Sequence, residues 1–380
     1  MLPSRQIDLL VIAGEHSGDA HAALGVRALK SLHPNLNICA IGGQALRQAG
    51  AHLLFDITQW SVVGLVESLR HYRQFVALMN WIVHWVEAYQ PREICLVDFP
   101  GFNLRLAKQL FDKKLTRKAG GKIPLCAYIA PQIWAWKSGR RFAMAKYFDR
   151  LAVLFAFEKE CFDDTSLDVQ YVGNPLIHEN LPFEYDESGE LLLLPGSRMV
   201  AVQRICPLLL DAFGLLSLKR SNLRGLILYP DESIKRFLEK LVEEKQLRQS
   251  IRMCHHSNLT AALKVSGALM SSGTASLKVA LAGIPGVVVY RAHYLTYLLG
   301  KMLIKVPYLS MANILLQRPA YPEILKPSSM QAFYASEKMQ TFLQDPKAAR
   351  QQFKKHADDL YNILSSPVDN SLEEFLLQDL

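Results

Sequence analysis

Short apolar runs alternate with longer amphipathic segments along the first half of the chain. The runs have the length of strands and lie at residues 7–13, 36–41, 94–98, 125–130 and 151–155. Continuous apolar strands separated by helical patterns are typical of βαβ units, whose parallel sheet is covered by helices on both faces. We therefore expect a Rossmann-like domain over residues 1–180.

The pattern breaks at residues 181–189, where Pro182, acidic residues and Ser188–Gly189 have the composition of a hinge. It then repeats, with strand-like runs at residues 191–194, 225–229, 251–254, 267–271 and 286–290. We expect a second Rossmann-like domain over 190–345 and C-terminal helices over 346–380 that return toward the first domain. The prediction is an α/β fold whose two Rossmann-like domains face each other across a cleft, with functional residues in the loops after the strands.

Composition narrows the class of protein. Half of the 380 residues are apolar and 21% are charged, so ordinary hydrophobic cores can form. The six cysteines lack the spacing of a disulfide framework or a zinc site, which fits a reducing cytosol. We expect neither a signal peptide nor a membrane span, because no uninterrupted apolar stretch reaches about 18 residues. The net charge of +8 suits an anionic partner such as nucleic acid, a phosphorylated ligand or an acidic lipid surface.

The first loop after a strand spans residues 14–19. Its two glycines permit a tight turn, and the following helix start supplies free N–H groups. Because its acidic residues would repel a pyrophosphate, we interpret Glu15, Ser17 and Asp19 as part of an acceptor-side or interdomain loop. The alternative is a simple turn with a helix cap.

Asp98 ends an apolar strand and precedes the segment 99–103. At the end of a buried strand beside a cleft, its carboxylate could accept a proton from an acceptor hydroxyl. Aspartate also favours the N-cap position of a helix, so a capping role is the alternative. The residues alone leave both interpretations open.

A third loop carries Trp134 and Trp136 and leads into Lys137, Arg140 and Arg141. Tryptophans beside a basic cluster could stack on a sugar ring and hold a phosphate. Packing of Trp134 in the core is the alternative.

Two loops of the second half favour phosphate binding. Gly196 lets backbone amides approach a phosphate, Ser197 can donate a hydrogen bond, and Arg198 can donate a charge-assisted pair. Residues 271–276 are small and open a helix whose N-terminus would bind an anion. We expect both loops on the same cleft edge, where they would bind pyrophosphate. The alternative is two turns with serine caps.

A strongly apolar helix is predicted over residues 71–89, with basic residues at its start. Burial in the core is one interpretation. The other is a surface helix that enters the lipid headgroup region. Its membrane-contact residues would be Phe75, Leu78, Met79, Trp81 and Ile82. Residues 294–306 are a weaker second candidate.

Seven motifs occur in order over nearly the whole chain: AGEHSGD (13–19), SVVGLVE (61–67), VDFPGFN (97–103), YIAPQIWAWK (128–137), LPGSR (194–198), SGTASL (272–277) and PYLSMANIL (307–315). Together they resemble the lipid-A-disaccharide synthase family. The resemblance implies the B-type glycosyltransferase fold and an inverting transfer in bacterial lipid A biosynthesis. The donor would be UDP-2,3-diacylglucosamine and the acceptor 2,3-diacylglucosamine 1-phosphate (lipid X), giving lipid A disaccharide 1-phosphate and UDP.

The resemblance also implies roles for individual residues. Asp98 would be the catalytic base. Acceptor-side residues would be Glu15, Ser17, Asp19, Glu67 and Asn103. Donor contacts would come from Gly196, Ser197, Arg198, Ser272, Gly273, Thr274, Ala275, Asn313 and Glu323. We expect no cofactor and no metal, since the missing DxD motif agrees with stabilisation of the leaving group by the protein.

Three positions depart from the family pattern: Ala201 and Lys278 stand where glutamate is usual, and Asn174 where histidine is usual. A lysine has only donors and cannot accept the ribose hydroxyls, but Lys278 could pair with a diphosphate oxygen. The alternatives are a catalytically weakened paralogue that binds membrane surfaces, or a transferase with another UDP-sugar. We expect a cytoplasmic protein peripherally associated with an anionic inner-membrane surface, with a homodimer allowed. Nucleic acid is not expected, because the basic residues at 113–122 lack interleaved aromatics.

Overall fold

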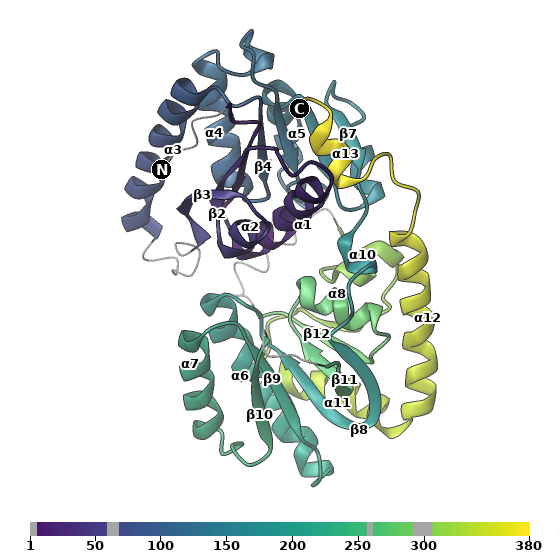
Figure 1. The fold of residues 1–380 in the computed structure, drawn as a ribbon. Helices are drawn as coiled ribbons and strands as arrows, with labels where there is room; N and C mark the ends of the chain where they lie inside the picture. The colour runs from purple at the N-terminus through teal and green to yellow at the C-terminus, as the bar shows by residue number, and fades with distance from the viewer. Residues whose placement is uncertain (1–5, 59–67, 257–260, 292–305) are drawn as a thin grey trace. The chain divides into compact units, whose positions relative to one another are not determined.

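The computed structural model describes residues 6–58, 68–256, 261–291 and 306–380, with the backbone alone at 68–72. The chain forms two compact units (Figure 1). Unit 1 contains the residues up to Pro175 together with Leu364–Leu380, and unit 2 contains Leu176–Ile363.

Unit 1 is built on a seven-stranded parallel sheet in the order β3-β2-β1-β4-β5-β6-β7. Its elements are β1 (Leu9–Ala13), α1 (His16–Leu32), β2 (Ile38–Gly42), α2 (Gln44–Gln48), β3 (His52–Asp56), α3 (Ser68–Tyr89), β4 (Glu93–Val97), α4 (Pro100–Asp112), η2 (Arg117–Ala119), β5 (Leu125–Tyr128), α5 (Arg140–Tyr147), β6 (Arg150–Val153), η3 (Ala156–Phe162), β7 (Asp168–Tyr171) and α13 (Leu372–Leu377). This is the Rossmann order, and the chain reverses its direction across the sheet between β1 and β4.

Alternate strand residues of unit 1 enter two separate cores. Leu10 and Ile12 of β1 pack in a core that includes residues of α3, α4 and α5. Leu9 and Val11 pack in a second core that includes residues of α1 and α13. Helices therefore cover both faces, as the continuous apolar strands predict.

The C-terminal helix α13 is an integral part of unit 1. Phe375 is fully buried in the core beside α1. Gly25 of α1 leaves room for α13, because a Cβ there would lie 2.9 Å from side-chain atoms of Leu372 and Leu376. Just beyond the helix, the Asp379 carboxylate forms an ion pair with Arg150 Nη1 at 2.5 Å. The predicted return of the C-terminal helices to the first domain is confirmed for α13.

Unit 2 repeats the architecture with a six-stranded parallel sheet in the order β10-β9-β8-β11-β12-β13. Its elements are η4 (Pro175–Ile177), β8 (Phe183–Leu194), α6 (Met199–Lys219), β9 (Gly225–Tyr229), α7 (Glu232–Glu244), β10 (Ile251–His255), β11 (Leu263–Met270), α8 (Thr274–Leu281), β12 (Gly286–Val289), α10 (Met311–Leu316), β13 (Glu323–Ile324), α11 (Gln331–Gln344) and α12 (Pro346–Leu364). The reversal of strand order lies between β8 and β11.

The predicted hinge at residues 181–189 is wrong, because most of this segment belongs to β8. Phe183 pairs with Leu263 of β11, and the register shifts after Lys264. Gly189 sits at this irregularity, where a Cβ would lie 2.6 Å from the Lys264 carbonyl oxygen. The glycine therefore marks a close approach of two strands and not a linker.

Among the described residues, α6 alone has the length and apolar composition of a membrane span. Leu209, Phe213 and Leu216 of this helix are nevertheless fully buried in unit 2, and Leu209 and Phe213 share a core with Leu193 of β8. Packing against the sheet accounts for the apolar character of α6.

Candidate functional site

The first two motifs meet at the reversal point of the sheet in unit 1. Ala13 of β1 pairs with Val97 of β4, so the loops after these strands begin side by side. Gly14 makes room for the Phe99 ring, because a Cβ at Gly14 would lie 2.2 Å from that ring. In α/β sheets of this kind, the carboxyl ends of strands beside the reversal point are the usual place for ligands.

Asp98 is held by its backbone on two sides. Its N–H donates to the Tyr128 carbonyl at 2.9 Å, and the Asn103 amide donates to its carbonyl. Asp98 and Phe99 have φ values of 47° and 50°, a left-handed conformation that is unfavourable for a residue such as phenylalanine. Strain of this kind concentrates at functional sites. The N-cap position of α4 is taken by Phe99, so Asp98 precedes the cap.

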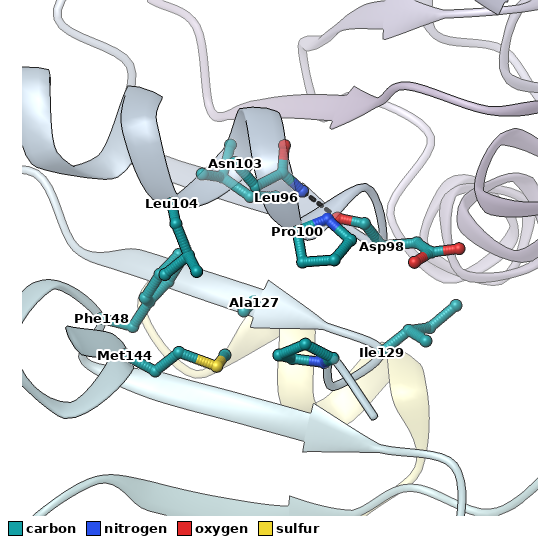
Figure 2. Close-up of a pocket in the computed structure, with 10 residues that line it drawn as sticks. Leu96, Asp98, Pro100, Asn103, Leu104, Ala127, Ile129, Met144 and Phe148 are labelled. Carbon is teal, nitrogen blue, oxygen red and sulfur yellow. Dashed lines mark hydrogen bonds between the residues drawn. The ribbon is translucent and has the colours of Figure 1, made fainter. Parts of the chain in front are cut away.

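A small cavity of about 20 Å³ lies beside this turn. Its lining includes Asn103, Leu104 and Phe148, and Figure 2 shows the Asp98 carboxylate pointing away from Leu104 and Phe148. Such a volume holds about one water molecule and is too small for a sugar. A cavity of this size cannot enclose the sugar of a substrate, although Asp98 is among the residues that line it.

The acceptor-side candidates of the first loop differ in exposure. Glu15 is partly buried at the N-cap position of α1, and Ser17 is exposed. Asp19 is buried, and its carboxylate accepts from the backbone N–H groups of Gly43 and Ala45 at 2.6 and 2.9 Å. The buried Asp19 carboxylate therefore caps the N-terminus of α2. Glu67 and the motif 61–67 lie outside the described residues.

The two tryptophans of the third loop have different surroundings. Trp134 donates from Nε1 to Glu158 Oε1 at 3.2 Å, and Glu158 is buried. This burial raises the pKa of the Glu158 carboxyl to about 7. Trp136 is 42% exposed, with Lys137 Nζ and Arg140 Cζ at 4.4 and 5.2 Å from its ring centroid. Trp134 is therefore partly buried against Glu158, while Trp136 is exposed at the surface.

In unit 2 the two glycine–serine loops also meet at the reversal point of the sheet. Leu194 of β8 pairs with Met270 of β11, and the Ser271 N–H donates to the Leu194 carbonyl at 2.8 Å. Gly196 has a φ of 109°, and a Cβ there would lie 3.3 Å from that of Ala201. The two predicted phosphate loops are thus brought together on one edge of this sheet.

Each of these two loops exposes residues where it leads into a helix. Ser197 and Arg198 are exposed just before α6. Gly273, Thr274 and Ala275 are exposed at the start of α8. The backbone N–H groups of such helix starts favour anions.

Ser272 has a structural partner, since its hydroxyl donates to the Leu309 carbonyl at 2.8 Å. Asn313 and Glu323, the other expected donor contacts of this region, also have partners within the protein. Asn313 is fully buried, and its amide bonds both backbone groups of Tyr321 at 2.8 Å. The Glu323 carboxylate accepts hydrogen bonds from the backbone N–H of Leu309 and from the side-chain amide of Asn313. These residues shape the segment 307–315 and tie it to the second phosphate loop.

Lys278 of α8 forms an ion pair that the sequence analysis missed. Its Nζ lies 2.5 Å from Glu179 Oε2, and both side chains remain partly exposed. The two residues are 99 positions apart, so no spacing pattern could indicate their contact. A carboxylate thus stands beside α8 although the helix itself carries a lysine.

Helix α3 is confirmed, but most of the residues that were expected to contact lipid are buried. Leu78, Met79 and Ile82 are buried in the core of unit 1, so they are not available to a bilayer. Phe75 is partly buried against the Phe99 and Phe102 rings. Trp81 alone of the five is exposed, at 44%. Of the weaker candidate, residues 294–305 lie outside the described part of the chain.

The described residues contain no group of three or more histidine, cysteine or acidic side chains placed to hold a metal ion.

Comparison with known proteins matches the chain to one family. The model of a family described as "Lipid-A-disaccharide synthetase" matches residues 9–377. A protein named "Lipid-A-disaccharide synthase 1" from Legionella pneumophila (strain Philadelphia 1) is 34% identical over 388 residues, covering 98% of this chain and 97% of the relative. A "Lipid-A-disaccharide synthase" from Coxiella burnetii (strain Dugway 5J108-111) is 31% identical over 343 residues, covering 87% and 88%.

Solved structures resemble the chain at much lower identity. UDP-GlcNAc 2-epimerase from Neisseria meningitidis gives a TM-score of 0.59 at 12% identity, covering 95% of this chain and 100% of that one. MurG from Acinetobacter baumannii gives 0.51 at 12% identity, covering 97% and 98%. These likenesses concern the fold alone, which is the B-type glycosyltransferase fold.

Proposed function

This chain belongs to the lipid-A-disaccharide synthase family, and from this premise we propose how its residues carry out the reaction. Its function is hexosyl transfer that forms the lipid A disaccharide. The donor is UDP-2,3-diacylglucosamine and the acceptor is lipid X, so the acceptor 6-hydroxyl attacks the anomeric carbon with inversion. A β-1,6 bond forms, the bond to the diphosphate breaks, and UDP leaves.

Asp98 accepts the proton of the acceptor hydroxyl in this proposal. The observation that carries the assignment is its position: it directly follows β4 at the reversal point, on a backbone fixed by Tyr128 and Asn103. A carboxylate so held can take the proton while the new glycosidic bond forms. Glu15 and Ser17 of the neighbouring loop contact the acceptor, as does Glu67.

The departing UDP is stabilised by the edge of the sheet in unit 2. Arg198 supplies a charge for a diphosphate oxygen, and Gly196 allows backbone amides to approach it. The starts of α6 and α8 add oriented N–H groups. These groups take the place of a metal ion, so excess EDTA is expected to leave turnover unchanged.

Glu179 supplies the carboxylate that accepts the ribose hydroxyls. Lys278 is four residues after Thr274, so the two residues lie on the same face of α8, one helical turn apart. Its ion pair with Glu179 brings a carboxylate to the side chain of a residue that follows the helix start by one helical turn. A carboxylate on this part of α8 supports the assignment of Glu179 to the ribose of the bound nucleotide.

The reaction takes place at the cytoplasmic face of the inner membrane, where the acylated substrates reside. Peripheral association with anionic lipid and assembly as a homodimer are parts of the proposal that light scattering, with and without vesicles, can test.

Donor binding is tested by steady-state kinetics with Arg198→Ala. Loss of a charge-assisted contact is expected to lower kcat/KM for the donor by roughly 10- to 100-fold. Arg236→Ala, an exposed arginine of α7, is the matched control. Equal donor kcat/KM in the two variants would contradict the assignment of Arg198.

A further inference from the structure

Two large aromatic side chains that are six residues apart in the sequence are exposed in unit 1. Trp136, in the loop after β5, is 42% exposed, and Phe142, in the first turn of α5, is 54% exposed. Each exposed ring offers apolar surface whose burial against a partner would be favourable. We refer to residues 136–142 as the aromatic–cation patch.

Basic side chains lie close to both rings. Lys137 Nζ and Arg140 Cζ lie 4.4 and 5.2 Å from the Trp136 ring centroid, and Arg141 Cζ lies 4.3 Å from that of Phe142. The sequence 137–146 contains four basic residues and no acidic one.

One of these cations is neutralised. Arg141 pairs with Asp164 at 2.5 Å, whereas neither Lys137 nor Arg140 has a carboxylate within ion-pair distance in the part of the chain that the structure describes. The patch therefore carries net positive charge beside exposed aromatic surface.

The patch lies on the same edge of the sheet as Asp98. Its loop follows β5, whose Tyr128 pairs with Val97 of the neighbouring strand β4. The Asp98 N–H donates to the Tyr128 carbonyl. The loop that carries Trp136 therefore begins beside the carboxyl end of β4, where the acceptor is proposed to bind.

We propose that the aromatic–cation patch docks unit 1 on an anionic phospholipid surface. Tryptophan prefers the depth of lipid headgroups, and each cation near an anionic membrane strengthens binding by about fivefold. The proposal rests on the proposed function in one respect, which is that both acylated substrates reside in a bilayer. The aromatic–cation patch is proposed in place of the predicted contact through α3, because Leu78, Met79 and Ile82 of that helix are buried.

The test is sedimentation of the full-length protein with phosphatidylcholine vesicles that contain or lack phosphatidylglycerol. Wild type is expected to bind the anionic vesicles preferentially. The pair Lys137→Glu and Arg140→Glu removes two cations, so binding should weaken by at least about 25-fold. Trp136→Ala with Phe142→Ala should weaken it by roughly tenfold.

Matched controls separate the patch from general surface charge and exposed rings. Lys118→Glu with Lys122→Glu reverses two charges before β5, at the opposite edge of the same sheet. Phe333→Ala removes a ring of unit 2 that is also 42% exposed. Lys118→Glu with Lys122→Glu should retain most of the vesicle binding, and Phe333→Ala should retain wild-type binding.

Vesicle binding by Lys137→Glu with Arg140→Glu equal to that of its control would overturn the proposal. So would unchanged vesicle binding together with weakened binding of water-soluble glucosamine 1-phosphate, since the patch would then be a phosphate subsite. Turnover of both substrates in neutral detergent micelles is measured separately. Wild type that binds anionic vesicles but forms no product in micelles would refute the proposed function and leave the docking surface standing.

Discussion

The Asp98 carboxylate is the group on which the proposed chemistry depends. Asp98→Asn keeps the size of the side chain and the backbone contacts to Tyr128 and Asn103, but it removes the proton acceptor. We expect kcat to fall by about 10²- to 10⁴-fold while KM for both substrates changes by only a few fold. Release of UDP followed under steady-state conditions measures both constants.

Asp112→Asn is the control for this change. Asp112 is exposed at the other end of α4, where it pairs with Lys108, so its variant should keep wild-type kinetics. If Asp98→Asn raises KM and leaves kcat unchanged, the residue binds the acceptor and does not take its proton.

The Glu179–Lys278 pair gives a second residue-level prediction. Glu179→Gln should weaken UDP binding by about tenfold, because a charged hydrogen-bond acceptor is lost. Exchanging the charges with Glu179→Lys and Lys278→Glu keeps one carboxylate in the pair and should recover most of this affinity. Titration calorimetry with UDP decides the matter: equal affinity in wild type and Glu179→Gln would exclude Glu179 from the donor site.

Residues near in sequence were easier to assign than residues near only in space. Asp98 follows a continuous apolar run, so its place at the end of a strand was predictable. The capping of α2 by Asp19 was not, since its backbone partners lie 24 and 26 residues away. The contact between Glu179 and Lys278 spans 99 residues and requires the fold to be known.

At the level of elements, the 3-10 helix η3 (Ala156–Phe162) links pH to stability through Glu158. Its folded pKa of about 7 lies above the reference value of 4.5, so the folded protein binds more protons between these values. The free energy of unfolding should therefore fall as pH rises from about 4.5 to 7 and level off above that, by about 3 kcal/mol in total.

Chemical denaturation at pH 5 and pH 8 tests this. From pH 5 to pH 8 the free energy of unfolding should fall in wild type through Glu158, and Glu158→Gln should lack this fall. The exposed Glu160→Gln should follow wild type. If the free energy of unfolding changes equally in wild type and Glu158→Gln between the two pH values, Glu158 does not titrate in this range.

The docking of α13 is a second prediction for an element. Phe375 is fully buried beneath the Arg150 guanidinium, whose Cζ lies 5.2 Å from its ring centroid. Phe375→Ala should cost about 3–5 kcal/mol by leaving a cavity, whereas Glu373→Ala should cost less than about 0.5 kcal/mol. Hydrogen exchange in β1 and α1 reports the loss, and unchanged protection there would show that α13 contributes little to unit 1.

The central strands were predictable from sequence because they are buried on both faces. The edge strands β3 and β7 were not predicted. His52–Asp56 and Asp168–Tyr171 carry polar residues, and β3 is at most partly buried along its length. Helix α3 was predicted, but its pattern could not distinguish a core from a bilayer, since both select the same apolar residues.

At the level of the whole molecule, each unit places its candidate site residues at the reversal point of its own sheet. Asp98 follows β4 beside the loop after β1, and Gly196 and Ser271 follow β8 and β11. The repeated strand pattern predicted two Rossmann-like domains, and the fold confirms this. The break at 181–189 misled because a bulged strand and a linker share glycine, serine and acidic residues.

The most direct test of the account is mass-spectrometric detection of product from the wild-type protein. UDP-2,3-diacylglucosamine and lipid X are supplied together in mixed micelles with excess EDTA. The account predicts lipid A disaccharide 1-phosphate and an equal amount of UDP. A folded protein that binds UDP but forms no disaccharide under these conditions, with or without added divalent metal, would contradict it.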